Sequence, residues 1–191
     1  METKKLDQKT KLIFENLDEI PVGIVISSLR IVNDAYFLSE IKDLKDLRRE
    51  VTEISDIVYD AIEIRMRRNR DSATLVLAID RGSVEIMIVG TGLLIEILKL
   101  TIGETIKDIY RESDLHKKIK NFLLGRRSYK RKKIKEVCKR GLERNLHVEV
   151  DIIEVDTGFD DYWENADITC HISYTYKNDK LVPRRPDEII E

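Results

Sequence analysis

The chain has 191 residues, 42% hydrophobic and 37% charged, so it is long enough for one domain with a core and too apolar for wholesale disorder. Its two cysteines, Cys138 and Cys170, are too few for a disulfide framework or a zinc set. The net charge of −2 hides an asymmetry, because residues 115–145 hold thirteen Lys or Arg against two acids, a net +11, and the remainder carries −13. Such asymmetry bears on partners rather than on fold.

Residues 3–32 are predicted to form a helix and then a strand. Residues 3–20 have an amphipathic pattern, are charged throughout and lack the apolar core of a secretory signal. Pro21 is expected to end this helix. Residues 22–32 are rich in β-branched side chains and short, which favours a strand. Asn33 and Asp34 then offer a turn or an N-cap.

Residues 36–69 give the clearest helical pattern, with an apolar seam at alternating spacings of three and four. The seam fits a helix that packs inside the domain. It also fits a surface for homodimerisation or for a partner protein. The residues of this predicted seam are Leu44, Leu47, Val51, Ile54, Val58 and Ala61.

Residues 73–79 and 84–89 are two β-rich runs about residues 80–83, which predicts a hairpin. A single strand with a bulge at Gly82 is the alternative. A helix over 93–112 follows Gly90-Thr91-Gly92. Glycines there can bring backbone N–H groups to a phosphate, but the third glycine and a P-loop lysine are missing, so we expect a tight turn.

Residues 86–102 are apolar enough to require a membrane test. The stretch has 17 residues and holds Glu96 and Lys99 near its centre, whereas a spanning helix needs about 20 mainly apolar residues. Each central charge costs on the order of 3 kcal/mol on insertion. These observations favour a buried strand, turn and helix over a membrane-spanning segment.

The basic block is predicted to form two short helices, 115–124 and 129–144, with Gly125 ending the first and Ser128 capping the second. Residues 147–155 alternate apolar and acidic side chains, and 166–177 form the expected antiparallel partner strand.

Three interpretations of the basic block remain open. Its cations could neutralise phosphates while Tyr129 and Phe122 stack on bases. A basic amphipathic helix could also lie on an anionic membrane, although large apolar anchors are missing. Alternatively, the block is a solvated face balanced by the chain's own acids, such as the eight between residues 148 and 167. The candidate nucleic-acid or polyanion-binding residues are Lys117, Lys118, Lys120, Arg126, Arg127, Tyr129, Lys130, Arg131, Lys132, Lys133, Lys135 and Lys139.

No catalytic or metal-binding set is legible in the sequence. Cys170 and His171 are neighbours on a predicted strand and should point to opposite faces. The triplet Asp156-Thr157-Gly158 is similar to that of retroviral-type aspartic proteases, but a second triplet is absent. The acids of residues 156–167 lack the EF-hand spacing.

The sequence therefore predicts an α+β domain over residues 1–180, with a polar tail at 181–191. Its mostly antiparallel sheet of about five strands would have long helices on one face. We expect a non-enzymatic cytoplasmic protein of bacterial or phage type, without metal or cofactor, that binds nucleic acid or another polyanion through 117–140. An interaction or homo-oligomerisation module that acts through the 37–64 seam is the alternative.

Overall fold

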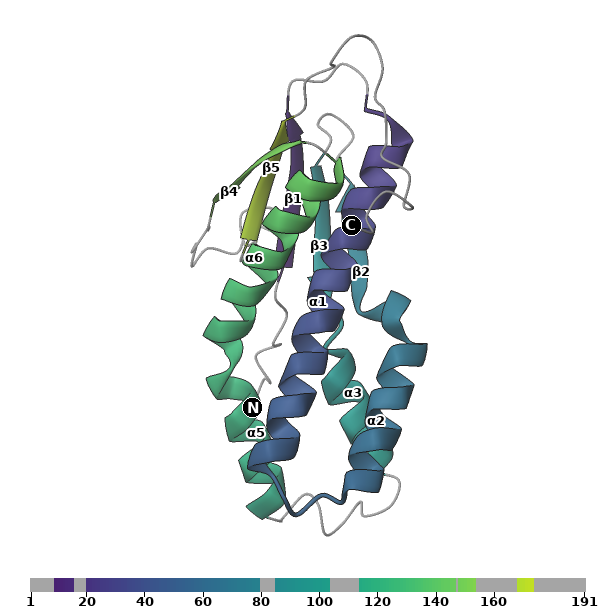
Figure 1. Cartoon of the computed structure of the whole chain (residues 1–191), viewed down its shortest axis with the longest axis vertical. Coiled ribbons are helices and arrows are strands. Elements are labelled where there is room, and N and C mark those ends of the chain that lie inside the picture. Colours follow the sequence, from purple (N-terminus) through teal and green to yellow (C-terminus); the bar gives the residue numbers. More distant parts are fainter. Residues whose placement is uncertain are drawn as a thin grey trace, which may run out of the picture.

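The computed structural model describes residues 9–15, 20–79, 85–103, 114–146, 148–153 and 168–173. Within these ranges, five strands form one sheet in the order β2-β3-β1-β5-β4. The helices α1 and α6 lie across one face of the sheet, and α2, α3 and α5 extend beyond its end (Figure 1). The strands are β1 Lys9–Glu15, β2 Thr74–Ile79, β3 Glu85–Gly90, β4 Glu149–Ile153 and β5 Ile168–Ser173. The helices are α1 Val22–Glu50, α2 Asp56–Arg68, the short 3-10 helix η1 Arg70–Ser72, α3 Leu93–Gly103, α5 Asp114–Gly125 and α6 Arg127–Leu146.

The α+β class is confirmed, but the sheet is mixed rather than mostly antiparallel. The strand pairs β1–β3, β2–β3 and β4–β5 are antiparallel, whereas β1 and β5 run parallel. The parallel pair joins the first and last described strands, which lie far apart in sequence and next to each other in the sheet. Its hydrogen bonds hold the two ends of the described chain together.

The predicted helix over residues 3–20 is wrong for its described part, because β1 is a central strand. Thr10, Leu12 and Phe14 are buried and alternate with half-exposed neighbours, which is the period of two that a strand requires. Both edges of β1 form ladders, with β3 on one side and β5 on the other. Pairing with two neighbours outweighs the weak local preference for a helix.

The predicted strand over residues 22–32 is also wrong, because these residues begin α1. Ile24, Ser28, Val32 and Ala35 are buried at spacings of four, four and three, a helical period that β-branched propensity had masked. The helix continues through Asn33, whose side chain is bonded elsewhere: its amide oxygen accepts from Thr74 N at 3.1 Å. Asn33, which we predicted to form a turn or an N-cap, is therefore a helical residue that attaches α1 to β2.

The single helix predicted over 36–69 is two helices, because the chain turns between Glu50 and Asp56. The Tyr59 hydroxyl donates to the carbonyl oxygen of Val51 (2.9 Å), just after the end of α1. It also lies 3.2 Å from the carbonyl oxygen of Leu47, which already accepts from the backbone N–H of Val51. Burial raises the pKa of Tyr59 to about 12, so it remains a donor at neutral pH. Neither glycine nor proline marks this turn in the sequence.

Both predicted hairpin pairs are antiparallel strand pairs in the structure. In β2–β3 the register shifts between Val76 and Ala78, which is a bulge in β2, and residues 80–84 lie outside the described chain. In β4–β5, Val150 lies opposite Ile172. The apolar stretch 86–102 forms β3, a turn and most of α3, and its side chains from Ile86 to Val89 are buried.

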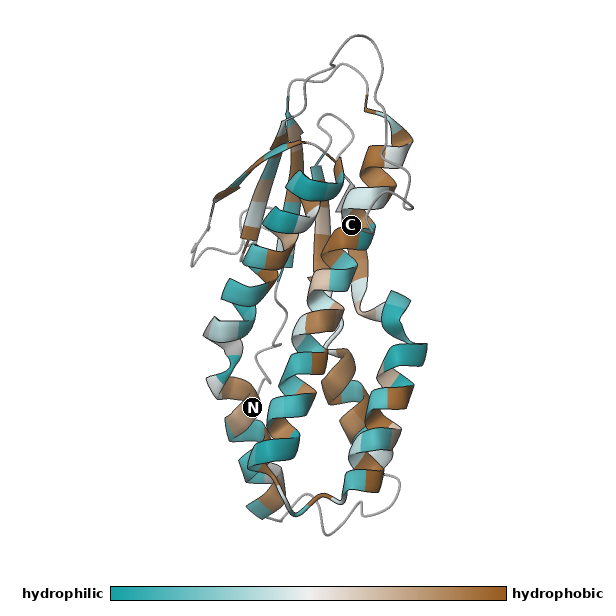
Figure 2. Cartoon of the chain, viewed as in Figure 1, coloured by the Kyte–Doolittle hydropathy of each residue, from teal (hydrophilic) through white to brown (hydrophobic). Residues whose placement is uncertain are grey.

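The core lies between the sheet and the helices α1 and α6. Figure 2 shows apolar and polar residues alternating along both helices. On α6 the buried residues are Ile134, Cys138 and Leu142, spaced by four. Gly141 lets α1 approach, because a Cβ there would lie 2.6 Å from Cγ2 of Ile31. This close contact fixes which side of α6 faces α1.

Among the described helices, α1 alone has the length and apolar composition needed to cross a membrane. Core helices of globular proteins pass the same test, and 39% of its most apolar window is buried inside the protein.

Candidate functional site

The predicted basic block folds into α5 and α6, which run one after the other along one side of α1 (Figure 1). Lys117, Lys118 and Lys120 lie on α5, and Arg126 lies at the junction of the two helices. The side chain of Arg127 lies outside the described part of the chain. The remaining predicted binding residues, Tyr129, Lys130, Arg131, Lys132, Lys133, Lys135 and Lys139, are on α6 and point in several directions from it.

Two of these predicted residues, Arg126 and Lys130, meet three carboxylates of α1. Lys130 Nζ lies 3.0 Å from Glu40 Oε1 and 3.8 Å from Asp43 Oδ2. Arg126 is in ion-pair contact with Asp46, and its Nε lies 3.7 Å from Asp43 Oδ1. Glu40 and Asp43 are almost fully buried. We call these five residues the inner charge cluster; its two cations are engaged by the protein's own acids.

Opposing electrostatic effects act on Asp43 within the inner charge cluster. Burial raises the pKa of Asp43, with a smaller contribution from nearby Glu40, while Lys130 and Arg126 oppose the rise. Asp43 Oδ1 and Nε of Arg126 are buried without an aligned hydrogen bond, so their contact is ionic in character. The Arg126 guanidinium also lies 4.7 Å from the ring centroid of Tyr129 and 5.4 Å from that of Phe122. Charge and ring contacts together hold Arg126 in place.

Glu40 also accepts a bond from the start of α3. Its Oε2 accepts from the backbone N–H of Leu94 at 3.1 Å, while its Oε1 faces Lys130. A carboxylate is stabilised at a helix N-terminus, where free N–H groups and the helix dipole both favour negative charge. The glycine turn that we weighed as a phosphate site is therefore tight, with Gly92 at φ +68°, and faces an internal carboxylate.

A second group of cations points away from the core. Lys132, Lys133, Lys139, Arg140 and Arg144 are exposed or half-exposed on the side of α6 opposite its buried stripe, and we call them the outer cation set. Lys133 and Lys139 have long ion pairs to Glu136 (3.9 Å) and Glu143 (3.7 Å). Lys132, Arg140 and Arg144 form no ion pair with another described residue. Arg131 and Lys135, by contrast, are half-buried and have contacts of their own.

Of the three predicted binding lysines on α5, Lys118 alone has a described ion pair outside that helix. Lys118 Nζ donates to Glu53 Oε1 in the turn after α1, and this bond lowers the pKa of Glu53 and raises that of Lys118. Lys117 lies 3.5 Å from Asp114 on the same helix, and Lys120 is exposed. Both pairs are solvent-accessible, so each contributes little to stability.

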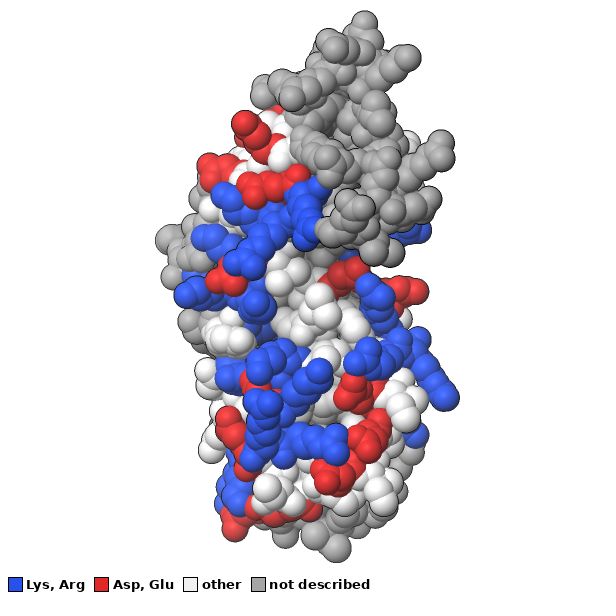
Figure 3. Space-filling view, viewed as in Figure 1, with Lys and Arg blue, Asp and Glu red and all other residues white. Residues whose placement is uncertain are grey.

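The space-filling view shows how these charges are distributed on one face. Lys and Arg side chains gather over α5, α6 and the lower part of α1, with Asp and Glu interspersed (Figure 3). The described ion partners of the basic block come chiefly from α1 and from the block itself. Residues 154–167, which hold most of the acids of the predicted hairpin, lie outside the described chain.

The two aromatic residues that we considered for base stacking are placed differently. Phe122 is 9% exposed and packs in the core. Tyr129 is 43% exposed on α6. Only Tyr129 therefore presents ring surface to solvent.

The predicted oligomer seam is internal. Leu44, Leu47, Val51 and Ile54 are buried, and Val58 packs against the same core. Ala61 is half-buried on α2. Because the chain turns at residues 51–55, these six residues do not form one continuous helix face. The four buried side chains hold α1, the turn and α2 together and are not accessible to a partner.

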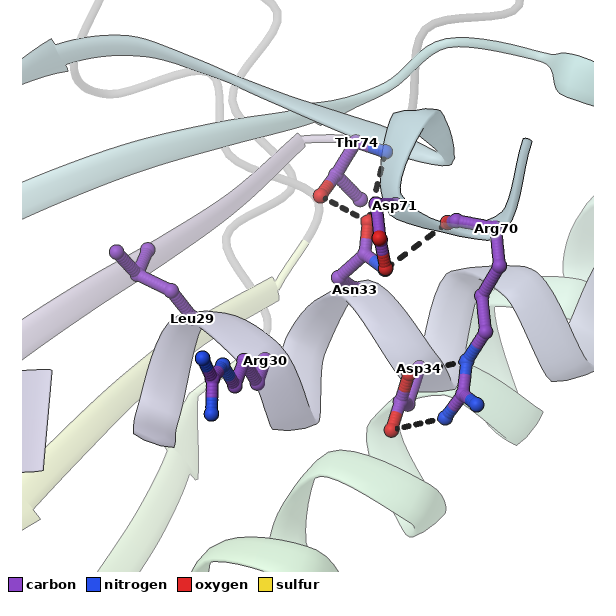
Figure 4. A pocket seen from close by; sticks show the side chains of 7 residues that line it. All are labelled: Leu29, Arg30, Asn33, Asp34, Arg70, Asp71 and Thr74. Carbon is purple, nitrogen blue, oxygen red and sulfur yellow. Dashed lines mark hydrogen bonds and ion pairs between the residues drawn. The ribbon is translucent and has the colours of Figure 1, made fainter. Parts of the chain in front are cut away.

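A polar pocket of about 500 Å³ lies between α1, η1 and the start of β2. In Figure 4 its walls are internally bonded: Asn33 accepts from Thr74 Oγ1 at 2.9 Å and donates to the Arg70 carbonyl at 3.1 Å. Arg70 and Asp34 are 2.7 Å apart. Most of its polar groups are thus used to attach α1 to β2. The lining is completed by Leu29, Arg30 and Asp71.

Cysteine and histidine chemistry receives no support from the described residues. Cys170 is buried under α6, whereas His171 faces the other side of the sheet and its Nδ1 lies 2.5 Å from Glu15 Oε1. Burial raises the pKa of Cys138 well above its usual range and that of Cys170 to about 12, so neither thiol is a thiolate at neutral pH. Within the described ranges, no group of three or more metal-ligating side chains is assembled.

Sequence reasoning missed the acidic half of the inner charge cluster and two cations of the outer set, Arg140 and Arg144. A signal for the acids existed. Tyr36, Glu40, Asp43 and Leu47 follow spacings of four, three and four, so both carboxylates lie on the buried stripe of α1. Acids on such a stripe indicate internal partners, because a buried charge requires a counter-charge.

Comparison of the chain with family models, with curated protein sequences and with solved structures finds no match.

Proposed function

We propose that this protein binds a polyanion through the outer cation set of α6. The observation that carries the proposal is the division of charge on that helix. The inner charge cluster uses Arg126 and Lys130, yet five further cations remain at the surface of the same helix. Exposed cations lined up on one rigid element are suited to neutralise the regularly spaced charges of a phosphate backbone.

The ion pairs within the outer cation set do not remove its capacity to bind. Glu136 and Glu143 lie 3.9 and 3.7 Å from their lysines, and all four side chains are between 40 and 48% exposed. Such surface pairs are worth between about 0 and 1 kcal/mol. A phosphate that offers each lysine a closer contact therefore competes at little cost.

A salt-dependent titration tests the proposal. Fluorescence anisotropy of labelled single-stranded and duplex oligonucleotides, in low and moderate salt, should show affinity that falls steeply as salt rises. With about four phosphate contacts, the log–log slope is expected near −3.6 on duplex and near −2.8 on a single strand.

The matched comparison is between two triple variants with the same change of charge. Lys133→Gln/Arg140→Gln/Arg144→Gln removes three outer cations and should lower the magnitude of the slope by about 0.7 to 0.9 per lost contact. Arg65→Gln/Arg67→Gln/Arg68→Gln removes three exposed cations from α2, which lies on the other side of α1 (Figure 1). Equal weakening by both variants, or a parent that binds neither nucleic acid at low salt, would overturn the proposal.

A further inference from the structure

The site proposed above carries one exposed aromatic residue, and its placement narrows the class of polyanion. Tyr129, Lys133, Arg140 and Arg144 follow spacings of four, seven and four along α6. At 100° per residue these positions fall along one edge of the helix, over a length of about 22 Å. An aromatic ring and three cations are thus in single file.

The acids of α6 border this file. Glu136 and Glu143, seven residues apart, fall between it and the edge that carries Lys132 and Lys139. A broad duplex laid along α6 would bring phosphates against both carboxylates, whereas a narrow strand that follows the file meets only Glu136, at Lys133. The arrangement of charge therefore favours one strand over two.

The ring of Tyr129 is held in place by Arg126. The Arg126 guanidinium stacks on it at 4.7 Å, and Arg126 is itself fixed by its ion pair with Asp46 and its contact with Phe122. Tyr129 is 43% exposed, so part of its surface is left for a ligand. A ring fixed before binding loses little side-chain freedom when a base stacks on it. Bases of a single strand are accessible for such stacking, and those within a duplex are not.

We infer that the outer cation set takes single-stranded nucleic acid, with a base stacked on Tyr129 and the adjoining phosphates on Lys133, Arg140 and Arg144. This inference rests on the function proposed above. An anionic lipid surface fits less well, since the file contains no large aliphatic side chain to insert.

The first test uses the parent protein alone. Two labelled single strands of about ten nucleotides are compared in anisotropy titrations at one salt concentration, one with its bases and one abasic. The phosphates are the same in both, so only stacking differs. We expect about 5- to 150-fold weaker binding of the abasic strand, which is the range for loss of one stacked base. Equal affinities would overturn the inference even though the polyanion proposal survived.

The second test changes the ring. Tyr129→Ala should weaken binding of the single strand by a similar factor and alter affinity for heparin, a polyanion without bases, by less than about twofold. Tyr129→Phe keeps the ring and should remain within about threefold of the parent. Melting curves establish whether each variant is folded. An equal loss of affinity for heparin and for the single strand would show that Tyr129 supports the surface rather than a base.

The outcomes separate the two claims. A parent that binds no polyanion at low salt removes both. A parent that binds duplex, heparin and single strands alike, with no effect of base removal, leaves the proposed function and overturns the inference. Binding to vesicles with anionic headgroups in preference to oligonucleotides would also overturn it.

Discussion

Both sides of α6 carry cations, which are paired with buried acids on one side and exposed to solvent on the other. Toward α1, Arg126 and Lys130 contact Asp43, Asp46 and the almost fully buried Glu40. Away from α1, the outer cation set meets solvent and two exposed glutamates. The formal charge of the block counts both groups equally. What a cation does is decided by its surroundings, because attraction between charges grows and hydration is lost as the site is buried.

The largest expected difference between the two sides is in stability. Lys130→Met leaves the buried Glu40 without its cation and Asp43 with Arg126 alone, and should lower the free energy of unfolding by roughly 3 to 5 kcal/mol. Lys132→Met, on the outer side of the same helix, should change it by less than about 0.5 kcal/mol. Urea denaturation monitored by circular dichroism measures both.

A double variant sharpens the same comparison. Adding Glu40→Gln to Lys130→Met removes the buried charge that Lys130 balances, so part of the loss should be recovered. No recovery, or a single Lys130→Met variant as stable as the parent, would contradict the assignment of Lys130 to the interior.

The next effect concerns the fit of α6 against α1. A methyl group on Gly141 would lie 2.6 Å from Cγ2 of Ile31, whose branched side chain has little freedom to move. Gly141→Ala should therefore destabilise the fold by about 1 to 3 kcal/mol despite the better helix propensity of alanine. Gly125→Ala is the control, because no atom of the described residues lies within 4 Å of its Cβ position. A stabilised Gly141→Ala variant would show that the two helices are less closely packed.

The pH dependence of stability follows from Asp43. Burial, with a smaller contribution from Glu40, raises its pKa above 3.8 against the opposing pull of Lys130 and Arg126. The protonated form is therefore favoured by folding. Its contribution is fully present below the unfolded pKa and is lost as pH rises through the folded value. Asp43→Asn imitates the protonated form, so the stability of the parent relative to this variant should fall as pH rises above 3.8. A relative gain over that range would contradict the sign.

The smallest expected change is at the outer surface. The triple variant Lys133→Gln/Arg140→Gln/Arg144→Gln should unfold within about 0.5 kcal/mol of the parent, because exposed ion pairs contribute little. Thermal melts read this directly. A loss of unfolding free energy as large as that of Lys130→Met would show that these cations stabilise the fold. It would contradict the distinction between the two sides of α6.

Local sequence patterns predicted the parts of the fold that local signals govern. The alternation near Val150 and the break at Gly125 marked the second hairpin and the two basic helices. The same reasoning failed at Leu12 and Ile24, where pairing with distant strands and burial on a helix overrode short-range propensity. Strand partners that lie far apart in sequence leave no periodic trace.

The charge division was only partly visible in the sequence. The apolar stripe of α6 runs through Ile134, Cys138 and Leu142, and Lys130 lies four residues before it on the same side. Glu40 and Asp43 likewise interrupt the buried stripe of α1. The matching of these two stripes depends on how the helices pack, which no single-helix pattern specifies.

The most direct test of the account is the salt dependence of oligonucleotide affinity, measured side by side for the parent, the outer triple variant and the α2 triple variant. We expect a steep slope for the parent, an unchanged slope for the α2 variant and a slope reduced by about 0.7 to 0.9 per lost contact for the outer variant. Identical slopes for all three proteins, or no binding by the parent at low salt, would contradict the claim that the outer side of α6 is a binding surface.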